Sequence, residues 1–255
     1  MQNFSLYAER DSGLHRLHPL TKALYVVLVL VAGFALPGRW TGYWLVLFGI
    51  LPAAAWGHVL GRHLLAVWRV TWPFALSIFL IQGFFWVGAL ALRKEGVQYA
   101  LIGIGRILVV MSSFVLFSLS TRPDTLMIAL KQVGLPSGIA YIFVTTLQII
   151  PRFQNKAATV MDAQRARGLQ TEGNLLARSR ALVPLVVPLV LGSLVDVEER
   201  AIAIEARAFN SKRKETSLVE IPDSPAQRRA RTALLVLTFG TLILGVLWPL
   251  LNSSK

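Results

Sequence analysis

The sequence contains no cysteine, which excludes a disulfide framework, a thiolate nucleophile and a cysteine-based metal site. It also lacks the G-x-x-x-x-G-K-S/T loop of ATPases and the H-E-x-x-H motif of zinc proteases. Of its 4 histidines, His58 and His63 lie five positions apart, off a common helical face, so we expect interface residues rather than metal ligands. We therefore predict no catalytic, cofactor-binding or metal-binding residue, and no enzyme activity in this chain.

Apolar residues are in excess: 55% of the 255 residues are hydrophobic and the mean hydropathy is +0.58, too apolar for an ordinary soluble domain. The net charge of +13 comes from 26 basic and 13 acidic residues. In a soluble protein this excess would suggest nucleic acid as a partner. Here the basic residues flank apolar runs, so we interpret them as holding the cytoplasmic side and meeting anionic lipid, with no nucleic acid bound.

Five apolar stretches are each close to the ~20 residues that a helix needs to cross the hydrocarbon core. Tryptophans lie near the ends of several of them, as expected at membrane interfaces. We predict an all-α integral membrane protein with about five transmembrane helices. The predicted spans are 20–36, 40–56, 72–92, 97–119 and 232–251.

The distribution of Lys and Arg predicts the orientation of these spans. No small-residue cleavage site follows the first apolar run, and further spans succeed it, so we expect the polar first segment to be retained rather than removed as part of a signal peptide. Residues 120–231 hold 16 basic and 10 acidic residues. We therefore place this region and the N-terminus in the cytoplasm and the C-terminus outside, which five spans allow.

Two polar residues fall inside predicted spans and form a candidate intramembrane polar pair. Gln82 and Arg106 lie near the middle of the third and fourth spans, which should form an antiparallel hairpin. A polar residue at this depth suggests a functional site. No acidic residue lies in these spans for a proton relay, so we favour a structural role. The two side chains would hydrogen-bond across the hairpin, or Arg106 would meet carbonyls of a partner subunit.

The region after the fourth span predicts a short amphipathic helix and then two long helical arms. Thr121 is the expected cap of the short helix and Gly134 its stop. Pro151 inside the first arm should kink the helix rather than necessarily end it, and the second arm holds Pro184 and Pro188 in its apolar run. On spacing alone, the arginines at the arm ends can equally be basic residues that complement the helix dipole in a last turn. Each arm ends in an Ala-Arg-small triplet: Ala166, Arg167 and Gly168 in the first, and Ala206, Arg207 and Ala208 in the second.

The second arm carries two further patterns. Asp196 precedes Arg200 by four positions, which favours an ion pair along the helix. An apolar seam with three- and four-residue spacing predicts a helix–helix contact. The seam consists of Leu194, Val197, Ala201, Ile204 and Ala208.

These motifs together resemble the transmembrane (T) component of energy-coupling factor (ECF) transporters, the family that includes the membrane subunit of the cobalt transporter. The resemblance covers nearly the whole chain. Ala208 departs from the pattern, because the family usually has Gly there. The matching residues are His18-Pro19-Leu20-Thr21-Lys22, Thr121-Arg122-Pro123, Gly134-Leu135-Pro136, Pro151-Arg152-Phe153, Pro184, Pro188 and the two triplets.

The resemblance implies a subunit that couples ATP hydrolysis to transport. The tips Ala166–Gly168 and Ala206–Ala208 would insert into two cytoplasmic ATP-binding cassette ATPase subunits, and the membrane part would hold a substrate-binding S component for a vitamin or a transition-metal ion. The protein would lie in the cell membrane of a prokaryote. The chain would divide into an N-terminal membrane domain (1–120), cytoplasmic coupling helices (121–212), a basic linker (213–231) and a last transmembrane helix (232–255).

Two other functions are considered. A self-contained secondary carrier would need acidic groups at mid-membrane and an internal repeat of discontinuous spans. A membrane-bound enzyme using residues 120–231 would need a paired acid and base. We find neither pattern in the sequence.

Overall fold

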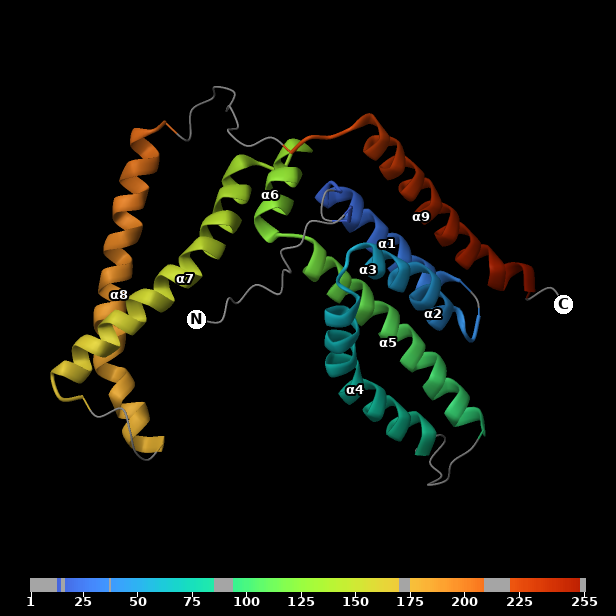
Figure 1. Cartoon of the computed structure of the whole chain (residues 1–255), viewed down its shortest axis with the longest axis horizontal. Helices are drawn as coiled ribbons and strands as arrows, with labels where there is room; N and C mark the ends of the chain where they lie inside the picture. The colour runs from blue at the N-terminus through green and yellow to red at the C-terminus, as the bar shows by residue number, and fades with distance from the viewer. Residues whose placement is uncertain are drawn as a thin grey trace. The chain divides into compact units, whose positions relative to one another are not determined.

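A computed structural model describes residues 13–14, 17–36, 38–84, 94–169, 175–208 and 221–252. Every element within these residues is a helix, as Figure 1 shows, so the all-α prediction is confirmed. The contacts divide the chain into two compact units, Met1–Leu135 with Ile221–Lys255, and Pro136–Glu220. The elements are α1 (Pro19–Ala35), α2 (Thr41–Trp44), η1 (Leu45–Ile50), α3 (Leu51–Trp56), α4 (Leu60–Phe84), α5 (Lys94–Ser120), α6 (Pro123–Gln132), α7 (Ser137–Ala166), α8 (Leu175–Ala206) and α9 (Pro225–Asn252).

Three helices in the described part of the chain are long and apolar enough to cross a membrane: Leu60–Gly83, Lys94–Ser120 and Pro225–Leu247. The first two predicted spans correspond to shorter apolar helices, α1 and the run Thr41–Trp56. With 17 residues, α1 is at the lower limit of the ~17–25 residues of spanning helices.

The third span begins earlier than the sequence suggests, at Leu60 rather than Trp72. The part of this helix before Trp72 carries the charged residues Arg62 and Arg69, which fall between the predicted second and third spans. His63 is fully buried there, and its Nε2 lies 2.8 Å from Ser112 Oγ on α5. This bond gives one ring nitrogen of the histidine a partner on the neighbouring helix and so joins α4 to α5. The predicted end of the span, 85–92, lies outside the described residues.

The second predicted span is a helix with a π-helical segment, η1, in its middle. Pro52 follows this segment and has no N–H to donate to the preceding turn. Widened turns of this kind accommodate such a break. The carbonyl of Gly49, within η1, accepts a hydrogen bond of 2.8 Å from Tyr25 Oη on α1. The irregular segment is therefore stabilised by a side chain from another helix.

The first unit packs through close contacts at small residues. A Cβ placed on Gly42 would lie 2.6 Å from the carbonyl oxygen of Gly105, so α2 and α5 cross with their backbones almost touching. Tyr43 Oη donates to the Leu101 carbonyl at 2.9 Å beside this crossing. A Cβ on Gly245 of α9 would likewise lie 2.6 Å from Ala35 Cβ of α1.

The short helix α6 packs on α1 and ends as predicted. Gly134 has φ +114°, and the Leu135 N–H donates to the Leu130 carbonyl at 3.1 Å, which closes the helix end. The predicted cap at its start is wrong. The N-cap is Arg122, with no side-chain cap hydrogen bond, because Thr121 is buried beside Ser120.

The second unit is built from α7 and α8, two long helices that cross each other (Figure 1). They contain 30 and 32 residues, so each is roughly 45–48 Å long at 1.5 Å per residue. Pro151 lies inside α7, and Pro184 and Pro188 lie inside α8. The prediction that Pro151 need not end the first arm is confirmed, and α8 likewise continues through its two prolines.

Candidate functional site

The first arm ends in a closed helix terminus that leaves one arginine exposed. Ala166 is the last residue of α7, Arg167 is its C-cap, and Gly168 follows with φ +88°. Gly168 N–H donates to the Arg165 carbonyl at 2.9 Å and Leu169 N–H to the Gln164 carbonyl at 3.0 Å. This pair of bonds satisfies the last carbonyls and stops the helix abruptly. Arg167 is thereby held at the tip, exposed to solvent.

The second arm ends in the same way, although it has alanine where the first has glycine. Ala206 is the last residue of α8, and Ala208 has φ +54°. Ala208 N–H donates to the Glu205 carbonyl at 2.9 Å, the counterpart of the Gly168 bond. Arg207 is exposed. The change from glycine therefore leaves the backbone turn in place and puts an L-residue in a left-handed conformation.

Exchanging the two terminal residues should have opposite effects on stability. An L-residue in the left-handed region costs about 1 kcal/mol relative to glycine. Ala208→Gly should therefore stabilise the end of α8, and Gly168→Ala should destabilise the end of α7 by a similar amount. Hydrogen exchange of the last turn of each helix measures this. Equal protection changes of the same sign would contradict the assignment.

The tip arginines are available to a partner. Arg165, two residues before the tip arginine, forms an ion pair with Asp162 at 3.7 Å. The guanidinium groups of Arg167 and Arg207 form no hydrogen bond or ion pair within the described residues. A guanidinium presents a planar fork of donors that matches carboxylates and carbonyls. Both tips are thus suited to insertion into a groove that carries such acceptors.

The two arms are joined at their crossing by Lys156 of α7. Its Nζ donates to the Gly192 carbonyl at 2.7 Å and to Asp196 Oδ2 at 2.7 Å, both on α8. The predicted ion pair of Asp196 with Arg200 is therefore replaced by a contact between helices. Sequence reasoning missed Lys156. The available signal was Gly192, because a glycine inside a helical run often marks a close approach.

Gln82 and Arg106 lie on the adjacent helices α4 and α5 but have different surroundings. Gln82 Oε1 is buried without a hydrogen-bond partner among the described residues. The Arg106 guanidinium lies over the Phe34 ring, 6.0 Å from its centre. The described residues do not form the predicted hydrogen bond between Gln82 and Arg106. A role in the membrane for either residue stays a prediction.

The starts of α1 and α9 are joined by a polar cluster that the sequence did not indicate. His18 caps α1, with its ring Nδ1 accepting from the Leu20 N–H at 3.3 Å, and the backbone N–H of His18 donates to Gln227 Oε1 at 2.9 Å. Asp223 accepts from Arg231 at 2.5 Å and from Arg228 at 2.9 Å. This cluster ties the ends of two helices that are distant in sequence.

Burial and the neighbouring charges shift the pKa values of His18 and Asp223. Burial lowers the pKa of His18 below 6.5, and Arg231 lowers it further, although Asp223 opposes the shift. Burial alone would raise the pKa of Asp223, but hydrogen bonds and charge from Arg228 and Arg231 hold it below its usual 3.8. The folded chain therefore prefers neutral His18 and ionised Asp223.

Acidification should weaken this cluster through His18. Because its folded pKa is lowered, its contribution to the free energy of unfolding is complete above about pH 6.5 and is lost as the pH falls below that. The stabilisation from Asp223 is fully present above its unfolded pKa of 3.8 and is lost only at lower pH, so it stays constant over this range. Thermal unfolding at about pH 7.5 and about pH 5.5 should show lower stability in acid. His18→Asn keeps a cap acceptor without a titrating ring and should reduce the difference; an unchanged difference would contradict this origin.

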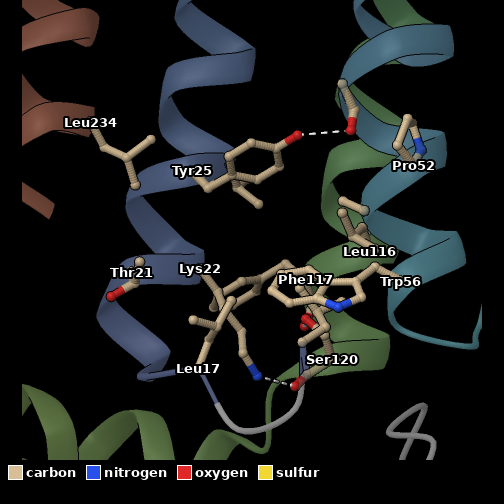
Figure 2. A pocket seen from close by; sticks show the side chains of 14 residues that line it. Leu17, Thr21, Lys22, Tyr25, Pro52, Trp56, Leu116, Phe117, Ser120 and Leu234 are labelled. Carbon is tan, nitrogen blue, oxygen red and sulfur yellow. Dashed lines mark hydrogen bonds between the residues drawn. The ribbon is translucent and has the colours of Figure 1, made fainter. Parts of the chain in front are cut away.

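A cavity of about 370 Å³ lies between α1, α3 and α5, and Figure 2 shows its lining. At one end Lys22 Nζ donates to the Ser120 carbonyl at 2.6 Å, at the end of α5. No carboxylate lines the cavity, so this part of the described structure holds no acid–base pair. Lys22 also connects two of the matching motifs, since Ser120 directly precedes Thr121. The lining residues are Leu14, Leu17, Thr21, Lys22, Tyr25, Val26, Gly49, Pro52, Ala53, Trp56, Leu116, Phe117, Ser120 and Leu234.

Comparison with known proteins places this architecture in a family. The family described as CbiQ, cobalt transport protein, matches residues 10–218. The energy-coupling factor transporter transmembrane protein EcfT of Thermosediminibacter oceani is 26% identical over 258 residues, covering 95% of this chain and 97% of the relative. EcfT of Limosilactobacillus fermentum is 27% identical over 244 residues (88% and 91%), and that of Lacticaseibacillus paracasei 29% over 226 residues (80% and 83%).

These matches agree with the apolar helices, which indicate a multi-pass protein of a prokaryotic cell membrane. Among the described residues, no group of three or more His, Asp and Glu could hold a metal ion. The family match covers most of the chain, including both arm tips. The chain therefore belongs to the CbiQ cobalt transport protein family, the transmembrane (T) components of energy-coupling factor transporters.

Proposed function

We propose that this chain is the scaffold and energy-coupling subunit of an ECF-type importer. Its tips Ala166–Gly168 and Ala206–Ala208 engage two cytoplasmic ATP-binding cassette ATPase subunits. Its membrane part holds a separate S component that captures a vitamin or a transition-metal ion. ATP binding and hydrolysis move α7 and α8, and these helices reorient the S component.

The observation that carries this proposal is the matching termination of the two arms. Both end in an exposed arginine followed by a residue with positive φ, at +88° and +54°. Two helices that stop abruptly on the same charged residue suit two similar grooves. Long helices also transmit a displacement that a flexible loop would absorb. The absence of an ATP-binding loop from the sequence is consistent with separate ATPase subunits.

Exposed apolar side chains on α8 support an additional partner contact. Leu194 and Val197, in the predicted seam, are each 60% exposed, and Ile202 nearby is 61% exposed. Apolar surface of this kind on a helix marks an interaction site or a membrane-facing surface. The seam stays a prediction, and we assign it to contact with another subunit or with lipid.

The proposed orientation places the N-terminus and residues 121–212 in the cytoplasm and the C-terminus outside. It follows from the excess of basic residues in 120–231. Because the sequence has no cysteine, single cysteines can be introduced and labelled from either side of the membrane. A cysteine at position 170 should be labelled only from the cytoplasm. Labelling from outside would overturn the orientation.

Co-purification tests the proposal directly. The tagged chain is expressed with its genomic neighbours, extracted in mild detergent and analysed for bound proteins. We expect two nucleotide-binding subunits and a small hydrophobic protein in a stoichiometric complex. A chain that purifies alone and transports a solute in liposomes by itself would favour a self-contained carrier instead.

A further inference from the structure

Lys156 holds two points on the partner helix at once. Its Nζ lies 2.7 Å from the Gly192 carbonyl oxygen and 2.7 Å from Asp196 Oδ2. Gly192 and Asp196 are four residues apart, one helical turn, so they lie on the same face of α8. Both acceptors are held by the same ammonium nitrogen, so the contact fixes the axial position of α8 against α7 at one point. We call Lys156, Gly192 and Asp196 the Lys156 brace.

Apolar packing contributes little to this crossing. Among the described side chains of α7 and α8, only Ala140 and Leu185 are buried. Two helices held by so few buried groups would slide easily past each other. The Lys156 brace therefore carries a large share of the register between them. Because Lys156 is 33% and Asp196 57% exposed, removing the brace should alter geometry more than overall stability.

Gly192 makes the approach of Lys156 possible. A Cβ at this position would lie 2.8 Å from Lys156 Cε and 2.9 Å from its Nζ. The lysine side chain is flexible enough to move aside, but it would then lose the Gly192 carbonyl. Glycine destabilises a helix interior by about 1 kcal/mol relative to alanine. Its presence in the middle of α8 is explained by this contact.

The brace is also placed symmetrically with respect to the two tips. Arg167 follows Lys156 by 11 residues, and Arg207 follows Asp196 by 11 residues. At 1.5 Å per residue, each tip lies about 16 Å along its helix from the brace. If the brace is a fixed point shared by both helices, displacing one tip moves the other tip by a similar amount, because the two tips are equally far from the brace.

We propose that the Lys156 brace is the pivot that makes the two arms move as one unit, with Lys156 as its positioning residue. This inference rests on the proposed coupling function of the arms. When an ATPase subunit displaces one tip, the brace keeps the register at the crossing. The motion then passes to the other arm and towards the membrane instead of being lost as sliding between the helices.

The brace is tested first in the isolated chain. Cysteines are introduced at Ala163 and Ala203 and carry spin labels that report the distance between the arms. Both positions are exposed, and each lies seven residues beyond the brace on its own helix. We expect one narrow distance distribution. Gly192→Ala and Lys156→Met should both lose the narrow peak. Gly138→Ala is the matched control, because it is also a helical Gly→Ala change, and its new Cβ has nothing within 4 Å.

The functional step is tested in the complex with the co-purified ATPase subunits. Because arms that move as one unit keep their separation, addition of ATP and vanadate should leave the narrow label distance unchanged with Gly138→Ala and should shift the distribution with Gly192→Ala, while both complexes still hydrolyse ATP. Identical distributions and shifts for the two variants would overturn the pivot. If no ATPase subunit binds even the unmodified chain, the coupling function fails instead. In that case the label distances of the isolated chain still decide whether the brace sets the crossing.

Discussion

Replacing Arg167 and Arg207 together with alanine is expected to release the ATPase subunits from the complex. Both guanidinium groups are exposed and form no bond within the described residues, so their loss should not disturb the fold. An arginine inserted in an interface groove typically contributes about 2 kcal/mol or more. At about 1.4 kcal/mol per tenfold, we therefore expect the affinity of each ATPase subunit for its tip to fall by about 30-fold or more. Co-purification and titration of the ATPase subunits against the reconstituted chain would measure it.

The matched control replaces two arginines on the same helices that lie away from the tips, Arg152 and Arg200. This double variant loses the same charge, so it separates the tip contact from a general electrostatic attraction. It should retain the ATPase subunits nearly as well as the unmodified chain. If the control and the tip variant lose affinity equally, the tips are not the docking elements.

Gly42→Ala is expected to destabilise the membrane part strongly. Its new Cβ would lie 2.6 Å from the Gly105 carbonyl oxygen and 2.7 Å from the carbonyl carbon. These are backbone atoms of α5, so the two helices must move apart to relieve the overlap. Overpacking of this kind costs about 1–3 kcal/mol. For a chain of this size it should lower the thermal midpoint in detergent by several degrees, roughly 2–4 °C per kcal/mol.

Gly61→Ala provides the comparison for this variant. Gly61 is also inside a helix, α4, and a Cβ there would meet nothing within 4 Å. The change should therefore be neutral or stabilising, since alanine favours a helix over glycine by about 1 kcal/mol. Equal midpoints for Gly42→Ala and Gly61→Ala would show that α2 and α5 do not meet as closely as described.

Features set by local chemistry were predictable from the sequence. Helical structure throughout, the apolar runs and the continuation of α7 and α8 through their prolines follow from composition, periodicity and the properties of single residues. The ends of both arms could also be located, because each Ala-Arg-small triplet closes a helical pattern. Glycine at position 168 predicted a left-handed terminus directly. At position 208 alanine hid the same conformation, and only the backbone revealed it.

The contacts between distant residues were decided by the tertiary structure. Nothing local indicates that Lys22 bonds to the Ser120 carbonyl, that His63 finds Ser112, or that Asp196 takes Lys156 instead of Arg200. In each case a buried or crossing polar group takes the partner that packing brings within reach, and that partner is 40 or more residues away in the chain. The sequence alone determined most of the helical segments and where the two arms end. Only the packing of helix against helix decided which polar groups pair, because hydrogen bonds depend on distances in space that residue spacing does not encode.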